Sequence, residues 1–561
     1  MRFKNGIRAG LWWTPLVALL AVAPFFWRGT SNGHDLPFHV NSWIEVGRQW
    51  KSGILYPHWA AFANFGNGEP RFVFYPPISW TIGALLGLIL PWQAVPGTLA
   101  ALVCTAAGVS MYLFASEWLD TQTAVLAAIL YAVNPYQLIV IYERGAFAEM
   151  IASIWIPGIL LFALRERGSF ARNTLLLAVH MALVWLTNIP AAVIATYLLA
   201  FVALIRAVQT RKFEPVLRAA ASLALGLGLA AFYLVPAIYE QRWVQVGAAV
   251  AAGASPRENL LFARTGDPER DAVLLRTSIF ALVEFCAALF CVGFASTLRR
   301  RLPQLYNVLL STLILVIVLL TPLSLPLWNY LPKLQFVQFP WRWLLVLNVV
   351  MMFFAAVAFA RSRTARLAVF AIIPIVIAIC YWKFQQPIYP EDRPVALAQA
   401  VADGAGYEGT DEYTPTQADN STFAPYMARI AIQISTENDE QRKVAPSTLA
   451  HSNAQVWDTL HKHFTMDAQV STRSTLRLLD YPLWHVTVDG APFQQTYNEA
   501  DGRMIIALPA GHHEVDIAYV NPPVHRWGLW ISFIALLLSI KLWFAMRSSE
   551  LTPEIPSRNV P

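Results

Sequence analysis

The polar residues best suited to chemistry gather in one segment near the start of the chain. Residues 28–80 place acids, histidines and arginines among aromatic rings and Pro/Gly turns, between two strongly apolar stretches. Asp35 follows the first apolar stretch by a few residues, with His34 beside it. A carboxylate at a membrane face could serve as a general base, bind a metal ion or face a phosphate-bound cation; alternatively it is an ordinary exposed acid at a helix end.

The residues near Asp35 in the sequence favour a functional role for it. Three further polar side chains of this segment are candidate substrate contacts: His39, Arg71 and Tyr75. Tryptophan, tyrosine and phenylalanine rings alternate with these charges, and rings beside charges suit a ligand that combines a sugar with an anionic head group. We therefore predict that residues 28–80 form an active-site loop.

Two other short segments hold charges that could join this site. Residues 141–149 contain Glu143, Arg144 and Glu149, which form either a local salt bridge or a site facing Asp35. Arg342 lies between two tryptophans at the mouth of an apolar stretch. It either anchors the chain at the membrane interface or clamps a phosphate.

The composition assigns the chain to a class. Of its 561 residues 56% are hydrophobic, and the mean hydropathy is +0.46, so the chain is a polytopic membrane protein. The net charge of +6 comes from basic clusters in short loops, where it sets membrane orientation and does not indicate nucleic-acid binding.

A scan for stretches of about 20 apolar residues predicts about twelve membrane spans. They are 11–27, 96–116, 121–140, 150–164, 173–189, 190–206, 217–237, 276–297, 304–321, 341–360, 366–384 and 527–546. The apolar stretch 78–92 is too short to cross and is predicted to be a re-entrant or interfacial half-helix. This choice keeps five basic clusters on the cytoplasmic side.

The number of membrane crossings also assigns each remaining segment to one side of the membrane. Both termini are expected in the cytoplasm, and the loops 28–95, 141–149, 238–275 and 322–340 are expected on the outer face. Residues 238–275 are rich in charge without an apolar period, and they include Arg242. They are predicted to form a long outer loop.

The composition changes again after residue 385. Short runs of period two between 464 and 520, separated by turn residues, are typical of antiparallel strands. The predicted fold is therefore mostly α. A transmembrane domain spans 1–384, an extracytoplasmic β-sandwich spans 385–526, the last span is 527–546, and a cytoplasmic tail covers 547–561.

Several motifs, taken in order, resemble a known group of membrane enzymes. They are GHDLPFH (33–39), LYPHW (55–59), GNGEPRFVFYPP (66–77), NPY (134–136), YERGAFAE (142–149), FYLVPAIYEQRWV (232–244), QFPWRW (338–343), YPLWHVTVDG (481–490) and LPAGHHEVDIAY (508–519). With the early Asp and the half-helix they resemble the glycosyltransferase C superfamily, integral membrane enzymes that move sugars from polyprenyl-phosphate or polyprenyl-pyrophosphate carriers. Within it they are closest to the bacterial membrane-protein family named "6-pyruvoyl-tetrahydropterin synthase-related".

The resemblance implies roles for particular residues. Asp35 would be the catalytic acid of the first loop, and Glu149, or else Glu143, the second-loop acid that shares a divalent cation such as Mg²⁺ or Mn²⁺ with it. Many relatives carry two adjacent acids where this chain has His34 and Asp35, so Asp35 could also act without a metal. No organic cofactor is implied.

The implied reaction is an inverting transfer of a sugar from a polyprenyl-phosphate donor to a glycan, lipid or protein acceptor at the outer face of the bacterial cytoplasmic membrane. Asp35 would take the acceptor proton, while Arg144, Arg342 and Arg242 would neutralise the leaving phosphate. The competing hypothesis is a polysaccharide export component without chemistry of its own. It predicts charged residues deep within the spans, where Glu284 and His180 are the main examples.

Overall fold

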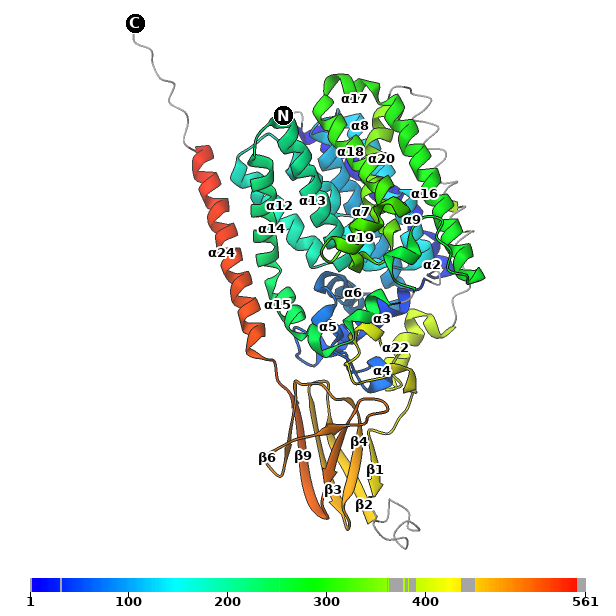
Figure 1. The fold of residues 1–561 in the computed structure, drawn as a ribbon, viewed down its shortest axis with the longest axis vertical. Helices are drawn as coiled ribbons and strands as arrows, with labels where there is room; N and C mark the ends of the chain where they lie inside the picture. Colours follow the sequence, from blue (N-terminus) through cyan, green and yellow to red (C-terminus); the bar gives the residue numbers. More distant parts are fainter. Residues whose placement is uncertain are drawn as a thin grey trace.

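Helices form one part of the protein and β-strands the other (Figure 1). The computed structural model describes residues 3–30, 33–251, 253–360, 362, 377–378, 382, 390–434 and 449–551. A bundle of apolar helices is followed by a small antiparallel sheet domain and one final long helix. The predicted fold class is confirmed.

The predicted spans form helices because each is a long apolar run whose backbone polar groups must be satisfied within the helix. The bounds are α1 Phe3–Val22, α7 Val95–Ser116, α8 Thr121–Ala132, α9 Pro135–Ile139, α10 Phe147–Ala152, α11 Trp155–Leu164, α12 Phe170–Trp185, α13 Ile189–Thr210, α14 Glu214–Leu229, α15 Ala231–Glu240, α16 Pro268–Phe294, α18 Pro303–Leu320, α20 Leu344–Phe359 and α24 Pro523–Leu551. The π-helical turn Val140–Arg144 extends α9.

Not all of these helices are long enough to cross a membrane alone. In the described part of the chain, eight helical stretches pass a test of length and apolarity, or up to nine when the bent pair α14 and α15 counts as one span. Trp12–Val22 and Phe170–Trp185 are shorter apolar helices. The predicted span 366–384 lies mostly outside the described residues.

Short helices cover the end of the bundle that faces the sheet domain (Figure 1). They are α2 Pro24–Arg28, α3 Leu36–Lys51, α4 Ala63–Gly66, α5 Arg71–Phe74, α6 Pro77–Ile89 and α22 Pro394–Ala402, while α17 Ser296–Arg301 and α19 Leu325–Tyr330 link longer helices. The helix α6 has 13 residues and stops at the Leu90-Pro91 step. It agrees with the predicted half-helix, because about 20 residues are needed to span a bilayer.

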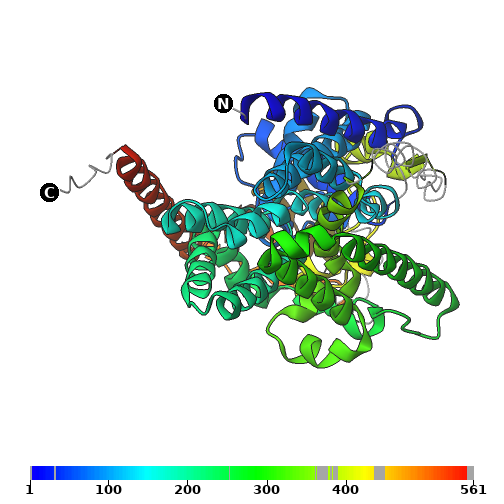
Figure 2. The same cartoon turned by 90° about the horizontal axis from the view of Figure 1, so that it is seen from above.

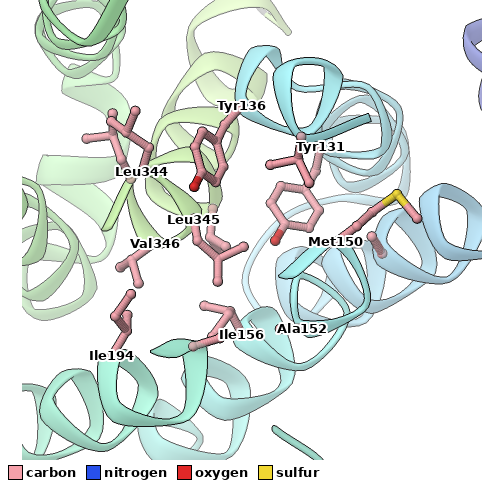
Figure 3. Close-up of a cluster of buried hydrophobic side chains, with 14 of the residues drawn as sticks. Tyr131, Tyr136, Met150, Ala152, Ile156, Ile194, Leu344, Leu345 and Val346 are labelled. Atoms are coloured by element: carbon pink, nitrogen blue, oxygen red, sulfur yellow. The ribbon is translucent and has the colours of Figure 1, made fainter. Parts of the chain in front are cut away.

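The centre of the bundle is packed with apolar side chains from helices distant in sequence (Figure 3). Tyr131 of α8 and Met150 of α10 lie near Ile156 of α11 and Leu345 of α20, and all four are buried. Such packing holds the ends of α8, α10 and α20 in fixed relation, and these ends carry the polar groups described below.

The sheet domain is a sandwich of two antiparallel sheets. Its strands are β1 Ile430–Ile434, β2 Ala450–Trp457, β3 His461–Ala468, β4 Thr472–Leu479, β5 Trp484–Val488, β6 Ala491–Phe493, β7 Thr496–Tyr497, β8 Arg503–Leu508 and β9 Gly511–Tyr519. The strand orders are β1-β4-β8-β7 and β2-β3-β9-β5-β6. Phe464 and Ile517 of one sheet share an apolar core with Leu476 and Ile506 of the other. The first described strand begins at Ile430. Before it, α22 packs on α3 of the bundle end, while Ala418 and Phe423 already belong to the apolar core of the sheet domain.

The last helix returns from the sheet domain along the side of the bundle (Figures 1 and 2). It packs on α15, α14 and α12. The helices α14 and α15 meet at a bend of 76° around Ala230, so α15 follows the lower part of α24. The amino terminus and α17, with Arg299 to Arg301, lie at the end of the bundle opposite the sheet domain (Figure 1).

Candidate active site

The first and second predicted loops meet through their backbones. The N–H of Asp35 donates to the carbonyl of Arg144 at 2.9 Å. A Cβ at Gly33 would lie 2.4 Å from the carbonyl carbon of Arg144, so only glycine allows this approach. Gly145 turns the chain with φ +62. The start of α3 is thereby fixed against the end of the π-helical turn, a type of helix irregularity that is frequent at functional sites.

Arg144 pairs with both predicted acids. Its Nη1 donates to Oε2 of Glu149 at 2.5 Å, and its Nη2 donates to Oδ2 of Asp35 at 3.3 Å. The two carboxylates differ in environment, since the Asp35 side chain is 41% exposed and that of Glu149 only 3%. Both alternatives for residues 141–149 thus occur as contacts: a local salt bridge between Arg144 and Glu149, and an ion pair of Arg144 with Asp35.

Glu149 is the centre of the cluster. It accepts a hydrogen bond from the hydroxyl of Tyr136, and Nε of Arg342 lies 3.2 Å from its Oε2. Three elements therefore converge on one buried carboxylate: α9, α10 and the turn before α20. Two arginines around one buried acid satisfy its charge, and with Asp35 included the cluster holds two positive and two negative groups.

Arg342 is held from the opposite side as well. Its Nη1 donates to the carbonyl of Val337 at 3.0 Å and to Oε1 of Gln338 at 2.7 Å. The side chain is only 10% exposed. Arg342 therefore pairs with protein groups, whereas an anchor at the membrane interface would expose its guanidinium; the phosphate clamp stays a prediction.

His39 follows Asp35 by one helical turn and is buried. Its Nδ1 lies 3.4 Å from the hydroxyl of Ser79, and its ring packs edge-on against Phe147 and Tyr75. Burial lowers the pKa of His39 to about 4, with the nearby Asp35 charge acting in the opposite direction. His39 is thus a neutral imidazole at physiological pH. Burial also raises the pKa of Tyr75.

The predicted metal site does not fit this arrangement. A cation shared by Asp35 and Glu149 would need the space between them, and the Arg144 guanidinium pairs with both. Within the described ranges, no group of three or more His, Cys, Asp or Glu side chains could hold a metal ion. The donor set present is two carboxylates neutralised by two arginines.

Arg71 lies in a separate buried cluster. Its Nε donates to Glu69 at 2.6 Å, and its other nitrogens donate to Ser42 and Thr410 at 3.2 Å each. Its guanidinium lies over the rings of Phe38 and Tyr407. Arg71 therefore connects the first loop to residues 407–410. No local sequence pattern predicts this contact.

The remaining predicted substrate contacts take no part in the ion pairs of Arg144 with Asp35 and Glu149. Arg242 is exposed and stacks on the rings of Tyr239 and Trp243, at 4.2 and 4.8 Å from their centroids. Glu143 is half-buried in the π-helical turn, and His34 is exposed beside Asp35.

Sequence reasoning missed Tyr136 and Gln338 as site residues. Tyr136 stands in the NPY motif, where Asn134 caps α9 by accepting from the N–H of Gln137 at 2.9 Å. Its position one helix before Glu149 was the available signal. Gln338 has a left-handed backbone with φ +64, which sequence alone does not indicate.

Comparison with known proteins gives one family and several distant structures. Residues 72–388 match the 6-pyruvoyl-tetrahydropterin synthase related domain, described as a membrane protein. No curated protein matches the sequence.

Two solved structures illustrate the distant similarities. The apo oligosaccharyltransferase of Archaeoglobus fulgidus is 14% identical, covers 73% of this chain and 57% of its own, and has a TM-score of 0.42. The mycobacterial arabinofuranosyltransferase AftD is 20% identical, covers 66% of this chain and 26% of its own, and has a TM-score of 0.41. The chain thus spans little more than half of the first protein's length and about a quarter of the second's. Since the family match covers more than half of the chain, the protein belongs to the 6-pyruvoyl-tetrahydropterin synthase related family of membrane proteins.

Proposed function

We propose that the protein is an integral membrane glycosyltransferase that moves a sugar from a polyprenyl-phosphate donor to an acceptor hydroxyl. The observation that carries this proposal is the pairing of an exposed carboxylate, Asp35, with Arg144 and the buried acid Glu149 where the first and second loops meet. The cluster provides a base and two guanidinium groups within one site. These are the groups that a displacement at a sugar phosphate requires.

Asp35 is the better base of the two acids. Glu149 is saturated by Tyr136, Arg144 and Arg342, and it is almost fully buried. Asp35 is 41% exposed, and its 3.3 Å contact with Arg144 is the longer of the arginine's two ion pairs. Asp35 can therefore reach an incoming hydroxyl without breaking the buried network.

In the proposed step, the acceptor oxygen attacks the anomeric carbon from the face opposite the phosphate. Asp35 takes the hydroxyl proton, the new C–O bond forms, and the bond from the anomeric carbon to the phosphate oxygen breaks. The electron pair stays on the leaving polyprenyl phosphate. Arg144 and Arg342 stabilise that charge by paired N–H donors, and the configuration at the anomeric carbon inverts.

The direction of the site in the membrane is part of the proposal. The cluster lies toward the sheet domain, whereas the amino terminus and the arginines of α17 lie at the opposite end (Figure 1). Because basic residues favour the cytoplasmic side, we place the site and the sheet domain outside the cytoplasmic membrane of a bacterium, with both termini inside. The donor tail would then lie among the apolar helices.

The step as written uses no metal ion. A divalent cation would have to displace Arg144 from at least one carboxylate before Asp35 and Glu149 could share it. Arg144 already supplies positive charge at that point, so we expect transfer to continue in the presence of a chelator.

The test is a sugar transfer assay with purified full-length protein and a panel of polyprenyl-phosphate sugars. Asp35→Asn should lower transfer by about 10²–10⁴-fold, the usual contribution of a general base, while the protein keeps its thermal midpoint. Asp467→Asn is the matched control, since Asp467 is an exposed carboxylate on the sheet domain. Full transfer by Asp35→Asn would refute the assignment.

The export hypothesis remains the second candidate, because a buried carboxylate lies well inside the long helix α16. Glu284 of α16 is 3% exposed, and its two oxygens accept from Nδ2 of Asn348 at 3.1 and 3.2 Å. Donor binding without turnover in wild type and Asp35→Asn alike, together with loss of glycan export in Glu284→Gln cells, would favour export.

A further inference from the structure

A cavity of about 870 Å³ lies between the bundle end and the sheet domain. Its walls are the last turns of α3, the segment around α4, residues 402–404, the start of β1 and the strands β2 to β4. Asp35, Arg144, Glu149 and Arg342 do not line it. The volume falls within the range of small-molecule binding sites, roughly 300–1,000 Å³.

The charges that line this cavity are mostly basic. The basic side chains are Arg48, Lys51, Arg429, Lys462 and Arg477, and the acidic ones are Glu45, Asp403 and Asp458. Burial raises the pKa of Glu45 to about 7 and lowers the pKa of Lys462 to about 7, so each of these groups carries only part of its charge near neutral pH, and four basic side chains remain against two acids. The cavity therefore presents a positive potential to a ligand.

Backbone carbonyls are the hydrogen-bond partners of two basic side chains of the cavity. Among the residues that the structure describes, no ion pair joins a basic side chain of the cavity to a carboxylate. Arg477 donates to the carbonyls of Gly404 and Met427 at 3.4 and 3.3 Å, and its buried Nε has no hydrogen-bond partner. Lys462 is 3% exposed and donates to the carbonyls of Asp458 and Thr459. Buried cations that lack an acid are costly, which favours an anionic ligand.

Aromatic rings lie beside these cations. Trp457 is half-buried at the end of β2, and Nζ of Lys462 is 6.0 Å from its ring centroid. On the opposite wall, the Arg48 guanidinium lies 5.2 Å from the centroid of the Phe62 ring. Rings supply apolar faces on which sugars stack, and arginine pairs with carboxylate or phosphate through parallel N–H donors.

We propose that this cavity binds an anionic saccharide, a glycan segment that carries carboxylate or phosphate groups, at a site separate from the Asp35 cluster. Inorganic anions are too small to engage both walls at once. A lipid tail would not suit walls that carry five basic side chains. On α3, Asp35 and Arg48 are 13 residues apart, about 20 Å at the rise of an α-helix. A glycan of several sugars could therefore occupy the cavity while another part of it reaches Asp35. That last reading, in which the cavity holds part of the acceptor, rests on the proposed function.

The experiment is isothermal titration calorimetry of the full-length protein in detergent. The probes are hexagalacturonate, a phosphorylated maltohexaose, neutral maltohexaose and inorganic phosphate. One or both anionic hexasaccharides should bind at least about tenfold more tightly than the neutral one, and the preferred probe identifies the charged group. Arg477→Ala should weaken that binding by about tenfold, equivalent to about 1.4 kcal/mol.

Matched variants separate this site from its surroundings. Arg473→Ala removes the same charge from the same strand at an exposed position outside the cavity, and it should bind like wild type. Asp35→Asn should also keep full binding, so a failed transfer assay would leave this result standing. If Arg477→Ala does not fold, Arg48→Ala is the alternative because Arg48 is exposed on α3.

Three outcomes would overturn the proposal. They are equal binding of neutral and anionic hexasaccharides, wild-type affinity in both Arg477→Ala and Arg48→Ala, and competition by inorganic phosphate with the affinity of the hexasaccharides. The third outcome would reduce the cavity to a site for simple anions.

Discussion

The two ends of α3 lie in contrasting electrostatic surroundings. Before its first residue, Asp35 joins a cluster in which two arginines and two acids neutralise one another. Near its last residue, Arg48 and Lys51 border a cavity whose basic side chains form no ion pair with a carboxylate among the described residues. Ion pairs fix the positions of the side chains in the Asp35 cluster, as a reaction requires. Basic side chains without ion pairs remain available to bind an anionic ligand. One amphipathic helix can thus connect a reaction site to a binding site.

The polar stripe of α3 runs between these ends. His39, Ser42 and Glu45 follow Asp35 at helical spacing and are all buried. Ser42 accepts from Arg71 at 3.2 Å, and Glu45 accepts from the hydroxyl of Tyr407. This stripe attaches α3 to the first loop and to the segment before the sheet domain, so the spacing of the two sites is fixed by buried hydrogen bonds.

The largest loss of stability is expected when the cluster at the start of α3 loses Glu149. Glu149→Ala leaves Arg144 and Arg342 buried without their common partner, which should destabilise the fold by about 3–5 kcal/mol. The thermal midpoint in detergent measures this loss. Glu214→Ala removes an exposed acid from its i,i+4 pair with Arg218 and should cost less than about 1 kcal/mol.

Glu149→Gln is a milder change, because it removes the charge of the side chain but keeps its volume and so creates no void in the packing. It should reduce transfer and leave the defect unchanged when Mg²⁺ or Mn²⁺ is added. Recovery with either ion would contradict the arginine-paired site and support a shared cation.

A smaller effect is expected from the contact that joins the two loops. The added methyl of Gly33→Ala would meet the Arg144 backbone at 2.4 Å and must displace one loop, at a cost of about 1–3 kcal/mol. The displacement would also move Asp35 and lower transfer. The control is Gly47→Ala on α3, where the added methyl meets nothing within 4 Å and should be neutral or stabilising. Equal behaviour of the two variants would show that the loops do not depend on this approach.

The sequence predicted the helices and the acids better than it predicted their partners. Long apolar runs and period-two alternation are local sequence patterns. The helical bundle, the short helix α6 and the β-sandwich could therefore be predicted from the sequence. The pairing of Asp35 with Glu149, or else Glu143, was implied by the family resemblance. The sequence analysis did not predict that Arg144 would lie between the two carboxylates. A metal ion and an arginine can both neutralise a pair of carboxylates, and the sequence does not distinguish between them.

The other missed features depend on long-range contacts. Arg71 was expected at the substrate, but it is buried against Thr410, 339 residues away in sequence. Arg242 was expected at the phosphate, yet it stacks on two rings near the sheet domain. The basic cavity joins side chains from α3 to β4, and no window of the sequence contains them together.

The smallest effect concerns Glu45, which lies between the two ends. Burial raises its pKa to about 7 from an ordinary value near 4.5, so the folded state favours the protonated acid. This stability is fully present below about pH 4.5 and is lost as the pH rises through 7. Between pH 6 and 8 the loss is about 1 kcal/mol. Glu45→Gln should flatten the fall in thermal midpoint over that interval, and an unchanged profile would show that Glu45 is already ionised beside Arg71.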